Sequence, residues 1–121
     1  MKVICDDQLN LWIDGELKTV AGQGVWNQVS TLSISKSTQS IGIRCRNNGG
    51  PHGILGSIQD ADGNDVLVTD NSWSCSNTFE FGWERPDFVE GDDWNAASYY
   101  PHREYISDNG LLLLEMIMFH L

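Results

Sequence analysis

An adjacent pair of acidic residues near the start of the sequence is the first candidate for chemistry. Glycosidases place two carboxylates on opposite sides of the bond that they cleave, and Asp6 and Asp7 supply two carboxylates. Adjacent residues of a strand point to opposite faces, which is the wrong arrangement for that reaction. The histidines are scattered, and no Ser, His and Asp triad follows from the spacing. We therefore expect a protein that is not an enzyme.

A second acidic run, D-A-D-G-N-D at residues 60–65, places oxygen ligands at alternate positions. Calcium loops of the EF-hand type share that alternation, but they need Gly at the sixth position and a distant Glu, and both are missing here. An Asp-Gly pair such as 62–63 is instead typical of a tight hairpin turn. We predict a turn and no cofactor, with calcium at an acidic loop as the alternative that stays open.

Tryptophan is abundant, with five copies in 121 residues. Its flat apolar face can cover a sugar ring, but the same side chain also fills cores. Trp26 and Trp83 follow loops that contain glycine, so we expect these two to be the exposed ones. The run N-N-G-G-P-H-G at residues 47–53 adds amides and an imidazole suited to sugar hydroxyls. The candidate ligand-binding residues are Trp26, Asn48, His52, Trp83 and Arg85.

Charge and length restrict the partners. The formal net charge is -10, with 17 acidic residues against 7 Lys and Arg. Such a surface repels nucleic acid and anionic lipid, and it leaves neutral polar ligands, cations or basic partners. The apolar residues 111–121 would span about 16 Å as a helix, well short of the roughly 30 Å core of a bilayer. We predict one domain without membrane insertion.

The three cysteines are Cys5, Cys45 and Cys75. They include no C-x-x-C pair, which argues against zinc. One disulfide and one thiol fit the odd count, and both Cys45–Cys75 and Cys5–Cys45 are compatible with the sequence. No apolar stretch of a signal peptide follows Met1, which predicts a cytosolic protein or a chain whose start is missing.

The elements that would position these residues are strands. Residues 9–14 alternate between apolar and polar side chains, which is the pattern of a strand with one buried face. The Asp-Gly pair at 14–15 fits a hairpin turn. Residues 41–46 alternate in the same way, and strands at 54–58 and 66–69 flank the second Asp-Gly pair. A bend at the acidic pair separates the first strand from an apolar lead at residues 3–4.

Several phrases of the sequence resemble one family. C-D-D-Q-L-N-L-W-I-D-G at residues 5–15 resembles the D-D-x-Y-x-L-Y-V-N-G hairpin of galactose-binding-like jelly-roll domains. I-G-I-R-C-R-N-N-G-G-P-H-G-I-L-G-S-I resembles their later I-A-V-x-x-x-N-x-G-G-x-x-G-L-L-A-x-I run. V-T-D-N-S-W-S-C-S and G-W-E-R-P-D-F-V-E-G-D-D-W resemble V-S-D-x-S-W-K-x-S and G-W-x-x-P-G-F-D-D-S-x-W. The similarity is ordered and extends to about residue 97.

The resemblance implies an all-β jelly-roll sandwich at residues 1–110 that lacks N-terminal and final strands, followed by an atypical hydrophobic tail at 111–121. It implies a secreted, non-catalytic lectin-like module that recognises neutral sugars of a glycan or glycoprotein through loop tryptophans and polar residues. It also implies that Trp73 and Trp94 anchor the core. The alternative is a structural or protein-interaction module of a larger extracellular protein.

Overall fold

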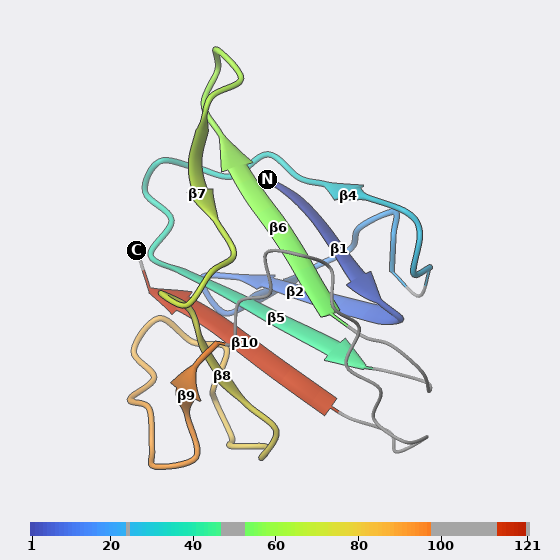
Figure 1. The fold of residues 1–121 in the computed structure, drawn as a ribbon. Helices are drawn as coiled ribbons and strands as arrows, with labels where there is room; N and C mark the ends of the chain where they lie inside the picture. The colour runs from blue at the N-terminus through green and yellow to red at the C-terminus, as the bar shows by residue number, and fades with distance from the viewer. Residues whose placement is uncertain (24, 47–52, 98–113, 121) are drawn as a thin grey trace.

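The computed structural model describes residues 1–23, 25–46, 53–97 and 114–120, and for 114–119 it describes the backbone alone. Within these residues all regular structure is β, and none of it is helical (Figure 1). The strands are β1 (Lys2–Asp6), β2 (Gln8–Ile13), β3 (Glu16–Lys18), β4 (Ser30–Thr31), β5 (Ser40–Arg46), β6 (Gly53–Gln59), β7 (Asp65–Val68), β8 (Ser74–Ser76), β9 (Asn95–Ala96) and β10 (Leu114–His120). The predicted all-β class is confirmed.

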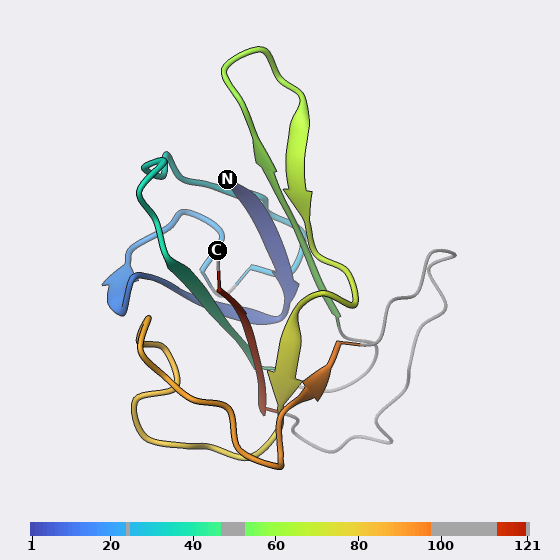
Figure 2. The ribbon, with the colours of Figure 1, turned by 90° about the vertical axis from the view of Figure 1, so that its left-hand side faces the viewer.

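The strands form two antiparallel sheets. One sheet has the order β4-β1-β6-β7, and the other has the order β3-β2-β5-β10-β8-β9. Figures 1 and 2 show the sheets as two layers, with the β6–β7 hairpin projecting beyond the rest in both views. The chain passes between the sheets several times, so neighbouring strands are often distant in sequence.

The core lies between the two layers and follows the predicted alternation. Val3 on β1 is buried, as are Leu9 and Leu11 on β2 and Ile41 and Ile43 on β5. Their polar neighbours point the other way, because successive side chains of a strand alternate between faces. One face of β2 and β5 therefore closes the core, and the opposite face is available for other contacts.

The two predicted Asp-Gly turns are confirmed. Asp14 and Gly15 have φ angles of 52° and 82°, as a two-residue hairpin turn of type I′ requires, and they connect β2 to β3. Gly63 has a φ angle of 84° in the turn between β6 and β7. The Asp60 carboxylate accepts hydrogen bonds from the backbone N–H groups of Asp62 (2.9 Å) and Asn64 (3.0 Å). This carboxylate therefore closes the second turn.

The acidic pair lies where the chain leaves one sheet for the other. Asp6 ends β1 in the four-stranded sheet, and β2 begins in the six-stranded sheet after Asp7. The N–H of Asp7 donates a hydrogen bond to the carbonyl oxygen of Arg46, at 3.1 Å. The pair marks the predicted bend between two strands.

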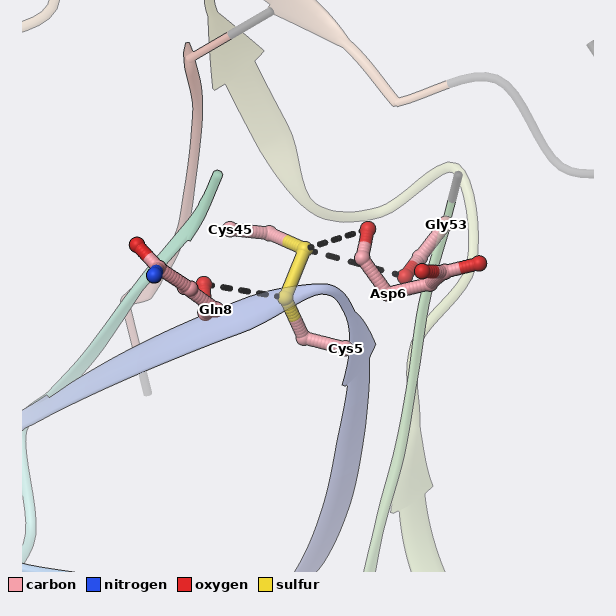
Figure 3. Close-up of a disulfide and its surroundings, with 5 residues drawn as sticks. All are labelled: Cys5, Asp6, Gln8, Cys45 and Gly53. Carbon is pink, nitrogen blue, oxygen red and sulfur yellow. Dashed lines mark hydrogen bonds between the residues drawn. A yellow bond between two sulfur atoms is a disulfide. The ribbon is translucent and has the colours of Figure 1, made fainter. Parts of the chain in front are cut away.

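A disulfide joins the sheets beside this bend (Figure 3). Cys5 on β1 is bonded to Cys45 on β5, with 5.8 Å between the two Cα atoms. Both residues are buried, and Cys75 lies outside this disulfide. Of the two pairings that the sequence left open, the structure contains Cys5–Cys45.

Carbonyl oxygens surround the two sulfur atoms. The Sγ of Cys5 lies 3.2 Å from the oxygen of Gln8, and the Sγ of Cys45 lies 3.4 Å from the oxygen of Asp6 and 3.8 Å from that of Gly53 (Figure 3). A disulfide sulfur carries no hydrogen, so these are packing contacts and not hydrogen bonds. They place the bend, the start of β2 and the start of β6 around one covalent link.

The sequence separated residues 111–121 from the domain as a hydrophobic tail. The backbone of β10 lies instead inside the six-stranded sheet, where it pairs with β5 from Leu114 to His120 and with β8 from Met116 to Met118. Both pairings are antiparallel. The segment connects β8 and β9 to the rest of the sheet.

Candidate functional site

Trp83 was predicted to be an exposed sugar platform, and this prediction is wrong. Only 2% of its surface is exposed. Its ring packs where the outer face of β5 has a glycine, and a Cβ at Gly42 would lie 3.1 Å from the ring. Trp12 contacts the ring edge-on, with 5.1 Å between centroids. Gly42 thus provides the room for an indole on the sheet, which removes Trp83 from the set of ligand-binding residues.

The loop around Trp83 is held by further aromatic contacts. Trp94 is buried and lies parallel to Trp83 at 6.2 Å, and Phe88 meets Trp94 edge-on at 5.4 Å. The indole N–H of Trp94 donates a hydrogen bond to the Glu80 carboxylate. Trp73 is buried as well, and its N–H donates to a carbonyl oxygen of β7. The core positions implied for Trp73 and Trp94 are confirmed.

The outward side of this loop carries Arg85. Its side chain is exposed, and its guanidinium lies over the ring of Phe81 at 5.5 Å. Phe81 itself is 83% exposed, and Phe79 and Val89 are exposed too. The loop therefore buries tryptophans underneath and presents apolar side chains and one cation to solvent.

Trp26 lies on a second, smaller loop and is 61% exposed. The backbone turns tightly here, because the N–H of Gly22 donates to the Ser30 hydroxyl at 2.8 Å and the N–H of Val25 donates to the carbonyl oxygen of Gly22 at 3.1 Å. A Cβ at Gly22 would lie 2.5 Å from the carbonyl oxygen of Gln28. Trp26 is thus held by a compact loop. The other two candidates, Asn48 and His52, lie outside the described residues.

A hollow opens beside this loop at the edge of the six-stranded sheet. β3 pairs with β2 only from Leu11 onward, so no strand in the described ranges pairs with residues 8–10 of β2 on that side. The hollow there has a volume of about 260 Å³ and is lined by Gln8, Leu9, Asn10 and Gln23. Three of the four lining residues carry side-chain amides. The amides alternate with apolar residues along β2, which is the signal in the sequence that could have identified two of them.

One of the amides is held by the neighbouring strand. Asn10 and Arg44 are direct partners across β2 and β5. Nη2 of Arg44 donates a hydrogen bond to Oδ1 of Asn10 at 3.0 Å, and the guanidinium lies 5.9 Å from the ring centre of Trp12. The hydrogen bond fixes which end of the Asn10 amide faces Arg44, so its NH₂ group is left for another acceptor.

A second hollow of about 260 Å³ lies at the edge formed by β8 and β9. Its lining is polar and includes the carboxylates of Asp92 and Asp93 together with Cys75, Ser76, Asn77, Thr78 and Asn95. In the part of the chain that the structure describes, no three His, Cys, Asp or Glu side chains group closely enough to hold a metal ion.

The carboxylate of Asp60 is hydrogen-bonded within its own turn. Hydrogen bonds from the backbone N–H and side-chain amide of Asn64, and from other backbone groups of the turn, lower the pKa of Asp60 even though this residue is fully exposed. These bonds favour the charged carboxylate. The same oxygens would have to be released before they could bind calcium, so the turn explains this acidic run better than a metal loop does.

We compared the chain with protein-family models, with curated proteins and with solved structures, and none of the three comparisons gave a match. Among the described residues, no helix is long and apolar enough to cross a membrane.

Proposed function

We propose that this protein is a non-catalytic carbohydrate-binding module, and that sugar binds in the hollow beside the Trp26 loop. One observation carries the proposal: three residues with side-chain amides, Gln8, Asn10 and Gln23, line one hollow, and the loop that supplies Gln23 also holds an exposed tryptophan. Exposed tryptophans are uncommon, because burial is their default.

The chemistry of these groups suits sugar hydroxyls. An amide offers an acceptor oxygen and two donor hydrogens, so it can accept from one hydroxyl and donate to its neighbour. An indole face covers the apolar C–H face of a sugar ring. The hollow is smaller than the roughly 300 Å³ at which enclosed ligand sites begin. It would hold a single ring, with the rest of a glycan in solvent.

The same groups support binding without bond cleavage. Side-chain amides do not ionise near neutral pH, whereas an acid or base catalyst must gain or lose a proton. Gln8, Asn10 and Gln23 are therefore suited to orienting a sugar and not to breaking its glycosidic bond.

The wider family and location are part of the proposal. The two-layer all-β arrangement and the ordered motifs support a galactose-binding-like jelly roll. The buried Cys5–Cys45 disulfide supports an extracellular protein, because disulfides persist in oxidising environments.

A glycan array probed with the whole chain tests the function. Binding to at least one neutral glycan is expected, and Gln23→Ala and Trp26→Ala should each weaken it at least about tenfold by calorimetry, as for anchor residues of an interface. Leu55→Ala is the matched control, since Leu55 is exposed on the other sheet and should leave the affinity unchanged. An array without any bound glycan would exclude this function.

A protein-interaction module is the second candidate, and the loop at residues 79–94 favours it. Buried tryptophans anchor the loop, whereas Phe79, Phe81 and Val89 are exposed on it. The same loop contains six acidic residues and one Arg, so a basic partner would complement it. Phe81→Ser should abolish binding of a labelled Lys-rich peptide, with Leu55→Ser as the control. Equal binding by both variants would exclude this surface.

A further inference from the structure

Two arginines lie next to the amides of the hollow. Arg44 and Arg46 are on β5, and their direct partners on β2 are Asn10 and Gln8. Directly opposed residues of antiparallel strands have their side chains on the same face of the sheet. The outer face of the six-stranded sheet therefore carries two rows, each formed by one amide and one guanidinium.

These arginines have no carboxylate partner in the described part of the chain. Among the described residues, the ion pair with its N and O atoms within 4.0 Å is that of Lys18 with Glu16, and it includes neither arginine. Acidic residues are nevertheless plentiful, since the whole chain has 17 of them against 7 Lys and Arg. Nη2 of Arg44 donates its hydrogen bond to Asn10, and the buried Nε–H of Arg44 donates to no acceptor among the described residues. Among the described residues neither arginine meets an anion, so both cations are available to an anionic group of a ligand.

Arg44 is also held in place before any ligand arrives. Its guanidinium lies near the ring of Trp12, at 5.9 Å, and is hydrogen-bonded to Asn10. A guanidinium in a fixed plane loses little further freedom when it binds a carboxylate through two parallel N–H groups. Arg46 is exposed on β5, directly opposite Gln8.

We propose that the ligand of this site is a glycan that contains a uronic acid residue, with the carboxylate bound by Arg44 and Arg46 and the hydroxyls bound by the adjacent amides. This inference rests on the proposed function and adds that the site prefers a glycan with a carboxylate to the neutral glycan of the same size. The net charge of -10 repels polymers with a high density of negative charge. The class that fits is therefore a largely neutral glycan with isolated carboxylates.

Calorimetry with a matched pair of oligosaccharides tests the inference. The whole chain is titrated with a galactose oligomer and with the same oligomer carrying one galacturonate residue. The acidic oligomer should bind at least about tenfold more tightly, the scale of one charge-assisted hydrogen bond, and the advantage should shrink as salt is raised. Methyl esterification of the galacturonate should remove the advantage.

Variants then assign the effect to the two arginines. Arg46→Gln should remove most of the preference for the acidic oligomer over the neutral one. Arg44→Lys keeps the charge but loses the planar fork, so it should reduce the preference less than Arg44→Gln does. Arg85→Gln is the control, because Arg85 is exposed on a different loop and contacts Phe81; it should change neither affinity.

The outcomes separate the inference from the function beneath it. Equal affinity for the neutral and acidic oligomers would overturn the inference and leave carbohydrate binding intact. Failure of both oligomers, together with an empty glycan array, would overturn the two together. Tighter binding of a densely sulfated polymer than of the single-carboxylate oligomer would replace the proposed site with a general anion surface.

Discussion

Two loops of this protein carry a tryptophan after a glycine, and the structure treats them in opposite ways. Trp83 is 2% exposed and packs on the sheet, whereas Trp26 is 61% exposed and faces solvent. The local sequences around them give the same expectation of an exposed ring. The difference arises on a distant strand, where Gly42 offers a place for one indole.

This contrast shows that the exposure of a tryptophan depends on whether another part of the fold offers a surface on which its ring can pack. Residues 42 and 83 are brought together by the sheet and not by proximity in the chain. Trp26 keeps 61% of its surface exposed, and its loop is closed by hydrogen bonds from the N–H groups of Gly22 and Val25. The Trp83 loop therefore packs on the sheet, whereas the Trp26 loop presents its ring to solvent.

The largest difference in stability should separate the two variants in which one of these tryptophans is replaced by alanine. Trp83→Ala should lower the free energy of unfolding by about 3–5 kcal/mol, because it opens a cavity among Trp12, Trp94 and Gly42. Trp26→Ala should change it by less than about 0.5 kcal/mol. Urea unfolding measures both. Similar losses in the two variants would contradict the contrast between the loops.

Reduction of the disulfide should come next. The Cys5–Cys45 bond holds the bend at the start of β2, next to the hollow, and its loss should cost about 2–4 kcal/mol. Hydrogen exchange should then rise more at residues 8–10 than around Trp83, which is held by aromatic packing. A Cys75→Ser variant should lose the same free energy of unfolding on reduction as the parent chain does, which controls for effects of the third thiol.

A single methyl group on the sheet should have a smaller effect. Gly42→Ala places a Cβ 3.1 Å from the Trp83 ring and should destabilise by about 1–2 kcal/mol, because the ring must shift. At Gly53 an added Cβ meets nothing within 4 Å, so Gly53→Ala is the matched control. Thermal unfolding of the two variants compares them. A buried ring such as Trp83 emits at a shorter wavelength than an exposed one. If the emission of Gly42→Ala stays at the wavelength of the parent chain, the predicted displacement of the ring is contradicted.

The smallest effect should be the dependence of stability on pH that comes from Asp60. Asp60 lies in the turn between β6 and β7, away from the two tryptophan loops, so it serves as a reference. Hydrogen bonds from Asn64 and the turn backbone lower the pKa of Asp60 in the folded protein. Its contribution to stability is therefore complete above the ordinary carboxyl pKa of about 3.9 and is lost as pH falls through the lowered value. Asp60→Asn should flatten the acid limb of a stability profile below about pH 4. An unchanged limb would contradict this assignment.

The fold could be predicted where local patterns decide it. The alternation along residues 9–13 and 41–45 predicted two core strands, and the two Asp-Gly pairs predicted two hairpin turns. The bend at Asp6 and Asp7 was predicted as well. These features depend on neighbouring residues, whose spacing a sequence shows directly.

The candidate site was harder to predict because its groups meet across strands. The register that sets Arg44 beside Asn10 and Arg46 beside Gln8 follows from the pairing of β2 with β5. The hollow also depends on where β3 ends. Neither fact is local, so sequence reasoning named Trp26 as a candidate and did not name the amides. The choice of Cys5 as the partner of Cys45 required the same long-range information.

The position of β10 has a consequence for how the protein assembles. β5 and β8 each pair with β10 and not with one another, so β8 and β9 can join the sheet only after residues 114–120 are in place. Until then both β5 and β8 present unpaired edges, which can capture other chains. Pairing between segments so far apart in sequence is slow to form. The chain should therefore be most prone to aggregate, and most dependent on chaperones, in the period before β10 pairs with β5 and β8.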